Sequence, residues 1–540
     1  MKISKILIAL LLICSFKVDA QTFQIKGKIN DVESSDFISN ANIQLVKTND
    51  STKSINKTAV SNLAGEFIIS DISQGDYILT ISHVSYEIYS KQFSVNADIT
   101  DLNIALAKSN ISLGIATVTS LKYEKQIKNI PYPLELVNNA DILKESAFSV
   151  SNVLQNKAGV ALYSDGVWAT AVNIRGLNQK RIVMLVDGNR LETASDLAAS
   201  LSLIDVDDIE RVEVIKGASS SLYGSGAMGG VVNIITKTGK YTQKNKFDGT
   251  VSTAYNTVNN LFKRKLSLNL SGKKFYTRFS GSLRDADNIE TPEGTIENSQ
   301  FSDKNLSFVA GYKFVDNHEL VLRYQKFWAE DVGMPGGAVF PGPAKATYTN
   351  AERNMFSFEY KITNISEHLN QLRFKYFNQS IIRDVELIPN TPPKYNLPQK
   401  ITAQKVLPTG EHYTNGIQIQ SDWNFSKHNL IAGIDAWQRK LSTEREKFIQ
   451  IDVLDVDSNI VATKELIRGE TPIPESTFGS AGIFFQDEFS TINEKLKVLI
   501  GGRFDGIRIE NDECFDVDYL VMNGTRNDNP PNQRITYEES

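Results

Sequence analysis

Apolar and polar residues alternate with a two-residue period along most of the chain from about Phe247 onward. Leu266, Leu268 and Leu270 alternate with serines and an asparagine, and the run from 356 to 362 has an aromatic or aliphatic residue at every second position. This period predicts β-strands with one apolar face. We count about eleven such strands, joined by short turns at one end and long polar loops at the other, as in transmembrane β-barrels. The short turns are 315–317 and 491–494, and the long loops are 285–303, 333–350, 386–414 and 448–477.

The chain before Phe247 has a different pattern. Residues 1–20 combine Lys2 and Lys5 with a short apolar run and end in Ala20, which predicts a cleaved signal peptide. Residues 21–107 contain short alternating runs separated by turn residues, which predicts a β-sandwich. Residues 108–130 form a linker. Residues 131–240 mix two amphipathic helical segments with short β-rich runs, which predicts an α/β domain. The predicted fold is therefore mainly β, with the barrel strands in residues 241–540.

Composition narrows the classes of function. The net charge of −5 provides no basic field for nucleic acid. No stretch of about twenty apolar residues follows the signal peptide, so the sequence predicts no helical channel. With Cys14 in the signal peptide, only Cys514 remains, and an intramolecular disulfide is excluded.

A glycine-rich segment joins the predicted α/β domain to the alternating strands. Gly224, Gly226 and Gly229 spell G-x-G-x-x-G, the dinucleotide-binding fingerprint, but the residues after Gly230 are VVNII. This β-branched run predicts a strand where the fingerprint needs a helix N-terminus. We therefore interpret the glycines as residues that supply special backbone angles and close packing. No serine or cysteine lies in a recognisable nucleophile motif, so we expect no catalytic residue, cofactor or resident metal.

Three further segments lie upstream of the glycines in a fixed order: Ile174-Arg175-Gly176-Leu177, Met184 to Arg190 (MLVDGNR) and Ile209 to Val214 (IERVEV). Together with the glycine-rich segment they resemble the plug domain of TonB-dependent outer-membrane receptors, which is followed by the first barrel strand. Residues 21–107 are similar to the carboxypeptidase-regulatory-like domain that precedes many of these receptors. The resemblance implies that the plug motif is formed by Gly176, Asp187, Gly188, Gly217, Tyr223, Gly224, Gly226, Gly229 and Gly230.

The resemblance also implies roles for individual residues. Ala116, Thr117, Val118 and Thr119 lie where the family has its TonB box, and a β-prone segment suits strand addition to a partner sheet. An ordinary linker strand is the alternative. Arg175, Arg211 and Glu213 are expected to contact the barrel wall, where arginines pair with carboxylates. Tyr163, Ser164 and Trp168 lie on a plug loop expected to face ligand, although a tryptophan that packs the loop fits equally well.

The predicted function is energy-coupled uptake of a scarce metal chelate across the outer membrane, with long loops outside and short turns in the periplasm. The resemblance implies TonB with ExbB and ExbD, outer-membrane lipid, and an extracellular ferric siderophore, haem or cobalamin as partners. About eleven strands are half of the roughly twenty-two that enclose a plug, so we expect a truncated barrel. The alternatives are a surface receptor or adhesin on the same barrel, a non-functional truncated receptor, and a soluble nucleotide-binding oxidoreductase supported only by the glycine fingerprint.

Overall fold

The computed structural model describes residues 22–535, with gaps of which the longest are 49–56, 108–116, 119–124, 127–132, 194–199, 336–343 and 491–495. The predicted signal peptide lies outside the described residues. The chain divides into two compact units at residues 117–128. Among the described helices, none is long and apolar enough to cross a membrane.

The first unit is the predicted β-sandwich. One sheet has the order β4-β1-β7 and the other β3-β2-β5-β6. Burial alternates along β1, where Ile25 and Ile29 are completely buried, because every second side chain of a strand points to the same face. These side chains form a single core between the sheets. The strands are β1 (Thr22–Asp31), β2 (Asn42–Lys47), β3 (Lys57–Val60), β4 (Glu66–Ser73), β5 (Gly75–His83), β6 (Tyr86–Val95) and β7 (Ile99–Leu106).

The second unit begins with the α/β plug. Its main sheet has the order β10-β16-β17-β14-β15, in which β14 runs parallel to β17 and antiparallel to β15. The described part of the plug also contains a three-stranded sheet, β11-β12-β13, and three short α-helices. Ser149 begins the second helix because its side chain and that of Asn152 form a reciprocal capping box. The elements are β10 (Leu134–Asn138), α2 (Asn139–Glu145), α3 (Val150–Leu154), β11 (Val160–Ser164), β12 (Thr170–Ile174), β13 (Leu177–Asn178), β14 (Ile182–Val186), β15 (Asn189–Arg190), η4 (Val206–Asp208), β16 (Ile209–Lys216), α4 (Ser220–Tyr223) and β17 (Gly230–Thr236).

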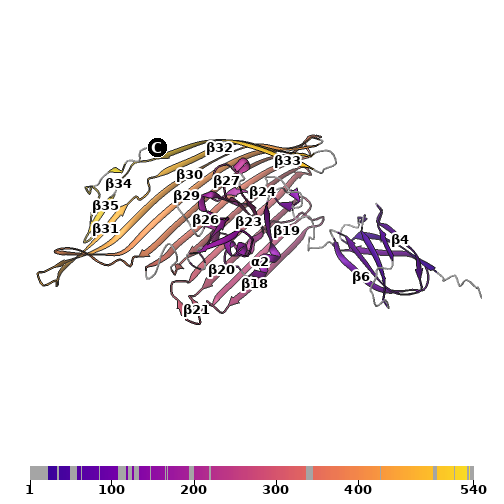
Figure 1. Ribbon diagram of the computed structural model, residues 1–540, viewed down its shortest axis with the longest axis horizontal. Coiled ribbons are helices and arrows are strands. Elements are labelled where there is room, and N and C mark those ends of the chain that lie inside the picture. Colours follow the sequence, from indigo (N-terminus) through magenta and orange to yellow (C-terminus); the bar gives the residue numbers. More distant parts are fainter. Residues whose placement is uncertain are drawn as a thin grey trace, which may run out of the picture. The chain divides into compact units, whose positions relative to one another are not determined.

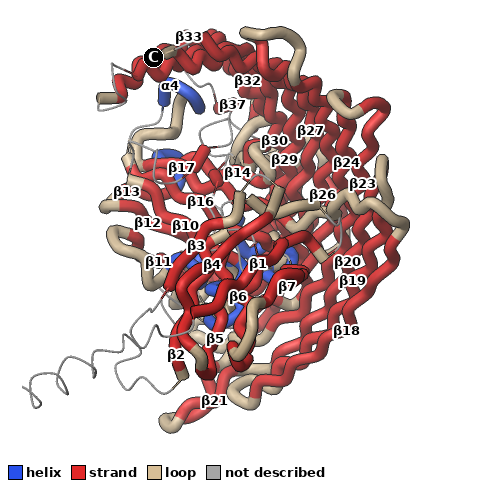
Figure 2. Tube along the Cα trace, turned by 90° about the vertical axis from the view of Figure 1, so that its right-hand side faces the viewer, coloured by secondary structure: helices blue, strands red, loops and turns tan. Residues whose placement is uncertain are grey.

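The rest of the second unit is a curved antiparallel sheet, here called the wall, which passes around one side of the plug (Figures 1 and 2). Its eleven long strands pair in sequence order, which confirms the predicted barrel architecture. They are β18 (Lys246–Asn256), β19 (Leu261–Ser271), β20 (Phe275–Ala286), β23 (Phe301–Val315), β24 (His318–Glu330), β26 (Lys345–Thr363), β27 (Leu369–Ile388), β29 (Gln399–Phe425), β30 (His428–Leu454), β32 (Ser476–Ser490) and β33 (Lys497–Asn511).

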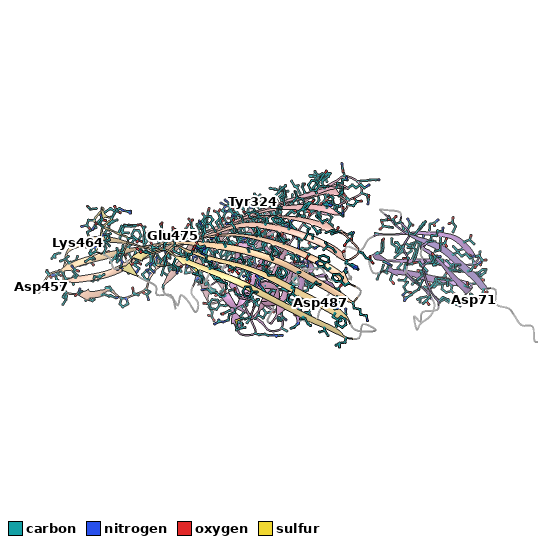
Figure 3. All side chains as sticks on the ribbon, turned by 90° about the horizontal axis from the view of Figure 1, so that it is seen from above. Asp71, Tyr324, Asp457, Lys464, Glu475 and Asp487 are labelled. Atoms are coloured by element: carbon teal, nitrogen blue, oxygen red, sulfur yellow. The ribbon has the colours of Figure 1, made fainter. Side chains whose placement is uncertain are left out.

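Several predicted loops are strands. β29 and β30 each contain 27 residues and pair along their whole length, so most of 386–414 and the beginning of 448–477 belong to the sheet. β31 (Ile460–Glu470) continues this extension by pairing with the end of β30. About ten residues suffice for a tilted strand to cross a membrane, so the wall continues well beyond a bilayer at this end. Figure 3 places Asp457 and Lys464 on this extension, with Asp487 toward the opposite end of the wall.

The two faces of the wall differ in polarity. On β20, Arg278, Ser282 and Arg284 are buried toward the plug, whereas Phe279 and Leu283 on the opposite face are 37% and 41% exposed. Lumen-facing polar residues that alternate with lipid-facing apolar residues are typical of transmembrane barrels. This alternation explains why the period was visible in the sequence, and it brings charged wall residues against the plug.

Candidate functional site

A short acidic turn of the plug contacts two neighbouring strands of the wall. Asp205 begins η4 by accepting a hydrogen bond from the backbone N–H of Asp207. Asp208 pairs with Arg278 at 2.6 Å, and Asp205 lies 3.6 Å from the Nζ of Lys265. Asp207 pairs with Lys263. The turn therefore presents three carboxylates to cations on β19 and β20.

Burial makes these carboxylates electrostatically unequal. Burial alone would raise the pKa of Asp205, but the positive charges of Lys265 and Arg284 outweigh it and lower that pKa below the ordinary value. Burial raises the pKa of Asp208 despite the opposing effect of Arg278. Asp205 is thus the carboxylate whose negative charge the wall stabilises most clearly.

Asp187, from the MLVDGNR segment, is a second polar contact with the wall. It adopts a positive φ of 51° at the turn between β14 and β15. Its carboxylate accepts hydrogen bonds from the backbone N–H and the hydroxyl of Thr236, at 2.9 and 2.7 Å. Its backbone carbonyl accepts a hydrogen bond from Lys375, and its carboxylate lies 3.9 Å from the Nε of Arg323. This aspartate therefore stabilises the plug turn and faces wall cations.

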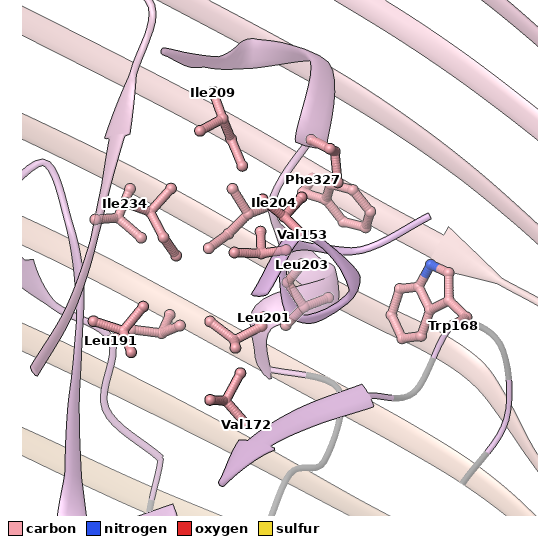
Figure 4. Packing of buried hydrophobic residues seen from close by; sticks show 14 of the residues in the cluster. Val153, Trp168, Val172, Leu191, Leu201, Leu203, Ile204, Ile209, Ile234 and Phe327 are labelled. Atoms are coloured by element: carbon pink, nitrogen blue, oxygen red, sulfur yellow. The ribbon is translucent and has the colours of Figure 1, made fainter. Parts of the chain in front are cut away.

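Trp168 lies in the contact between plug and wall. Its side chain is 1% exposed, and its ring centroid is 6.3 Å from that of Phe327 and 6.1 Å from that of Tyr348 (Figure 4). Its indole N–H donates to Asp303 at 3.1 Å, and Arg284 donates two hydrogen bonds to the same carboxylate. Of the two alternatives that the sequence left open, the structure shows the packing tryptophan.

The arginines of the family motifs, Arg175 and Arg211, take no part in the ion pairs described above. Arg175 is exposed on the turn after β12, and Arg211 pairs with Glu213 of its own strand at 2.8 Å. Glu213 is completely buried. Among the described residues, neither arginine forms an ion pair with a wall carboxylate. The pairs between plug and wall instead have the opposite polarity to that implied by the resemblance, because the plug supplies the carboxylates and the wall the cations.

The glycines of the fingerprint are structural. Gly230 has a φ of +150°, and a Cβ there would lie 2.2 Å from the carbonyl oxygen of Ile215. Gly224, with a φ of +73°, packs against the guanidinium of Arg503 on β33. Gly230 to Thr236 form strand β17, as the β-branched run predicted. The segment therefore joins plug strands and touches the wall, and the fingerprint glycines are followed by a strand rather than by the helix N-terminus that a nucleotide phosphate needs.

Cavities lie between the described residues of the plug and those of the wall. The outer cavity, of about 430 Å³, is toward the long extensions and is lined by Tyr163, Arg190, Glu192, Trp437, Arg439 and Phe478 among others. The inner cavity, of about 800 Å³, is at the end with the short turns and includes Arg211, Thr363, Asn424 and Lys497. A constriction of about 50 Å³ shares Arg190 and Trp437 with the outer cavity, and Gly188, Tyr223 and Lys375 with the inner one.

The outer cavity brings together residues that the sequence analysis did not single out. The rings of Trp437 and Phe478 stack with centroids 5.2 Å apart. The guanidinium of Arg190 lies over Trp437, and that of Arg439 over Phe478. Glu192 pairs with both arginines, at 2.6 and 3.4 Å. Of the predicted ligand-facing residues, Tyr163 lines this cavity, whereas Ser164 hydrogen-bonds to Gly166 within its own loop.

The predicted TonB box is only partly described. Thr117 and Val118 form a short strand, β8, that pairs with β9 (Lys125–Gln126). Ala116 and Thr119 lie outside the described residues. Thr117 and Val118 therefore adopt an extended form.

Two family models match the chain. Residues 126–231 match the TonB-dependent receptor plug domain, and residues 25–118 match the CarboxypepD_reg-like domain. The vitamin B12 transporter BtuB of Photobacterium profundum is 37% identical over 131 residues, which are 24% of this chain and 22% of that protein.

Solved structures show the same fold. The copper transporter OprC has a TM-score of 0.56 at 16% identity, over 75% of this chain and 59% of that one. P. aeruginosa FpvA bound to heterologous pyoverdines has a TM-score of 0.57 at 13% identity, over 77% and 59%. The chain thus spans about three-fifths of these receptors. These relatives are receptors and transporters rather than enzymes. The chain thus contains a TonB-dependent receptor plug domain and a CarboxypepD_reg-like domain, and its second unit has the fold of these receptors.

Proposed function

We propose that this chain serves TonB-dependent uptake of a scarce metal chelate across the outer membrane, with the outer cavity as the ligand site. The observation that carries the proposal is the pairing of Arg190 and Arg439 with a stacked aromatic pair at the junction of plug and wall. A site that combines apolar rings with a few convergent charges is typical of small-ligand pockets.

The chemistry of the cavity favours an anionic chelate with planar groups. Glu192 already occupies both guanidinium groups, so a ligand carboxylate or catecholate oxygen has two positions at which to replace it. Trp437 and Phe478 provide flat apolar surfaces beside those positions. Ferric siderophores combine both features, and the relative that is bound to pyoverdines agrees with this class.

Energy coupling rests on the segment around Thr117. A short extended strand outside the plug sheet suits strand addition to an edge of TonB, which ExbB and ExbD energise. Pulling on this segment acts on β10, which pairs with β16 at the edge of the plug sheet. The ion pairs between plug and wall can break and re-form, whereas the apolar cluster that joins Trp168 to Phe327 and Tyr348 has to separate if the plug moves away from this side of the wall.

Binding tests the proposal directly. Purified full-length chain in detergent is titrated with ferric pyoverdine, ferric citrate, haemin and cyanocobalamin while tryptophan fluorescence is recorded. We expect saturable quenching by at least one chelate, lost in Trp437→Phe and weakened by about ten- to a hundredfold in Arg439→Gln, the effect of one charge-assisted hydrogen bond. Trp328→Phe is the matched control, because Trp328 lies on β24 outside the cavity lining. If all four chelates fail to bind, the ligand assignment is wrong.

A further inference from the structure

Arg190 connects the outer cavity to the segment 222–225, whose Tyr223 lines the constriction. It lies on β15 and lines both spaces. Its Nη1 donates to Glu192 in the outer cavity at 2.6 Å. Its Nη2 donates to the backbone carbonyl of Tyr223 and, at 3.3 Å, to that of Ser225. One guanidinium therefore bonds to an anion at the ligand site and to two carbonyls of the segment 222–225.

The segment 222–225 is also held from the wall. Arg503 of β33 donates to the carbonyl of Leu222 at 3.4 Å and pairs with Asp435 at 2.7 and 2.8 Å. Tyr223, which belongs to this segment, and Asp435 both line the constriction. Two arginines thus hold the segment in place, but only Arg190 is accessible from the outer cavity.

The lining of the constriction includes a buried side-chain amide that has no hydrogen-bond partner among the described residues. Asn189 is 2% exposed, and neither its Nδ2 nor its Oδ1 has a hydrogen-bond partner among the described residues. A buried amide without partners is uncommon, because desolvation of its polar atoms is costly. The amide lines the constriction, which shares residues with both larger cavities, so its donors and acceptor are available to a polar group that enters there.

The inner cavity differs from the outer one because most of its charges neutralise each other. Three lysines pair with glutamates within its lining: Lys361 with Glu319 at 2.8 Å, Lys375 with Glu359 at 3.5 Å and Lys497 with Glu488 at 3.7 Å. Such pairing leaves little net attraction for an anion. The inner cavity therefore suits passage, whereas the outer cavity suits capture.

We propose that Arg190 is a gate residue: an anionic group bound in the outer cavity draws its guanidinium away from the carbonyls of Tyr223 and Ser225, and the released segment opens the constriction to the inner cavity. The step involves only exchange of hydrogen bonds and ion pairs. Glu192 keeps its pairing with Arg439 when Arg190 turns to the ligand. The inference rests on the proposed function, since it regulates the same ligand site.

The gate has a test that needs no ligand. A reporter cysteine replaces Asn189 in the full chain, with Cys14 and Cys514 changed to serine, and its labelling rate by a charged thiol reagent is measured in detergent. Because position 189 is buried, labelling requires the constriction to open. We expect Arg190→Gln to raise the rate by about tenfold or more, the effect of losing charge-assisted hydrogen bonds. Arg439→Gln, which removes a cavity arginine that makes no bond to 222–225, should label at the original rate.

The labelling rates of these variants decide whether Arg190 is a gate residue. The gate is overturned if the reporter cysteine is labelled at the same rate in Arg190→Gln and in its parent. It is also overturned if Arg439→Gln accelerates labelling as much as Arg190→Gln does. If Arg190→Gln does not fold, Arg190→Lys replaces it, because a single ammonium cannot bond to Glu192 and both carbonyls at once. An unchanged labelling rate in Arg190→Lys also overturns the gate. Ferric citrate, added as an anionic probe, should accelerate labelling only when Arg190 is present. A chain that binds no chelate but still opens in Arg190→Gln refutes the proposed function and supports only the part of the inference in which Arg190 holds the segment 222–225.

Discussion

Replacement of Trp168 tests how firmly the plug is attached to the wall. The indole is 1% exposed and donates to Asp303 at 3.1 Å across the interface. Trp168→Phe keeps an aromatic ring beside Phe327 but removes the N–H donor. A hydrogen bond to a charged acceptor contributes about 1.5–3 kcal/mol. Because Arg284 continues to bond to Asp303, we expect the lower half of that range, about 2 kcal/mol, which corresponds to roughly a thirtyfold change in an opening equilibrium.

The assay is hydrogen–deuterium exchange of the purified chain in detergent, followed in peptides that cover α3 and β12. Amides there exchange when the plug opens locally, so the rate should rise roughly thirtyfold in Trp168→Phe. Trp168→Ala should destabilise more, by about 3–5 kcal/mol, because it also leaves a cavity. Trp328→Phe, on β24, is the control. If exchange in Trp168→Phe matches that control, the indole does not attach the plug to the wall.

Three further changes probe the same interface. Asp208→Ala leaves the buried Arg278 with its hydrogen bonds to Ser267 and Asn269 but without its paired carboxylate, and should weaken plug attachment by about 3–5 kcal/mol. Asp285→Ala, in an exposed pair with Arg264, should change it by less than about 1 kcal/mol in the same exchange assay. The pKa of Asp205 is lowered in the folded state, so its carboxylate stabilises the plug above the ordinary pKa, and this stabilisation is lost as the pH falls toward the folded-state pKa. Thermal unfolding of the plug from pH 7 to pH 3 should show this loss. Asp205→Asn should abolish the part of the pH dependence that comes from Asp205. Gly230→Ala places a Cβ 2.2 Å from the carbonyl oxygen of Ile215 at a φ of +150° and should lower the melting temperature of the plug, with Gly281→Ala, where the nearest atom is 3.6 Å away, as the tolerated comparison.

The strands of the wall were predictable because lipid on one side and polar surroundings on the other impose a two-residue period. The run 356–362 accordingly lies in β26, and Leu266 to Leu270 lie in β19. The same reasoning placed loops at 386–414 and 448–477, where β29 and β30 in fact continue. Beyond the bilayer a strand has no lipid face to cover, so its sequence loses the alternation that identified the others.

The contacts between plug and wall were not predictable from one sequence. Asp208 and Arg278 are 70 positions apart, and nothing local indicates which wall strand will face η4. The acidic run from Asp205 to Asp208 was visible in the sequence, but the family resemblance directed attention to Arg175 and Arg211. Pairing depends on how the wall curves around the plug, and that geometry is set by strand register rather than by local pattern.

The polarity of these contacts has a consequence for transport. The wall face that holds the plug carries cations such as Lys265, Arg278 and Arg439, and plug carboxylates neutralise them. Movement of the plug uncovers those cations, and a desolvated charge without a partner is costly. An anionic ligand in the opening space offsets that cost by taking the position of the carboxylate, as Glu192 already illustrates between Arg190 and Arg439. A cationic ligand offers no such compensation, so under the proposed function we expect the reversed polarity to favour anionic ligands during plug movement.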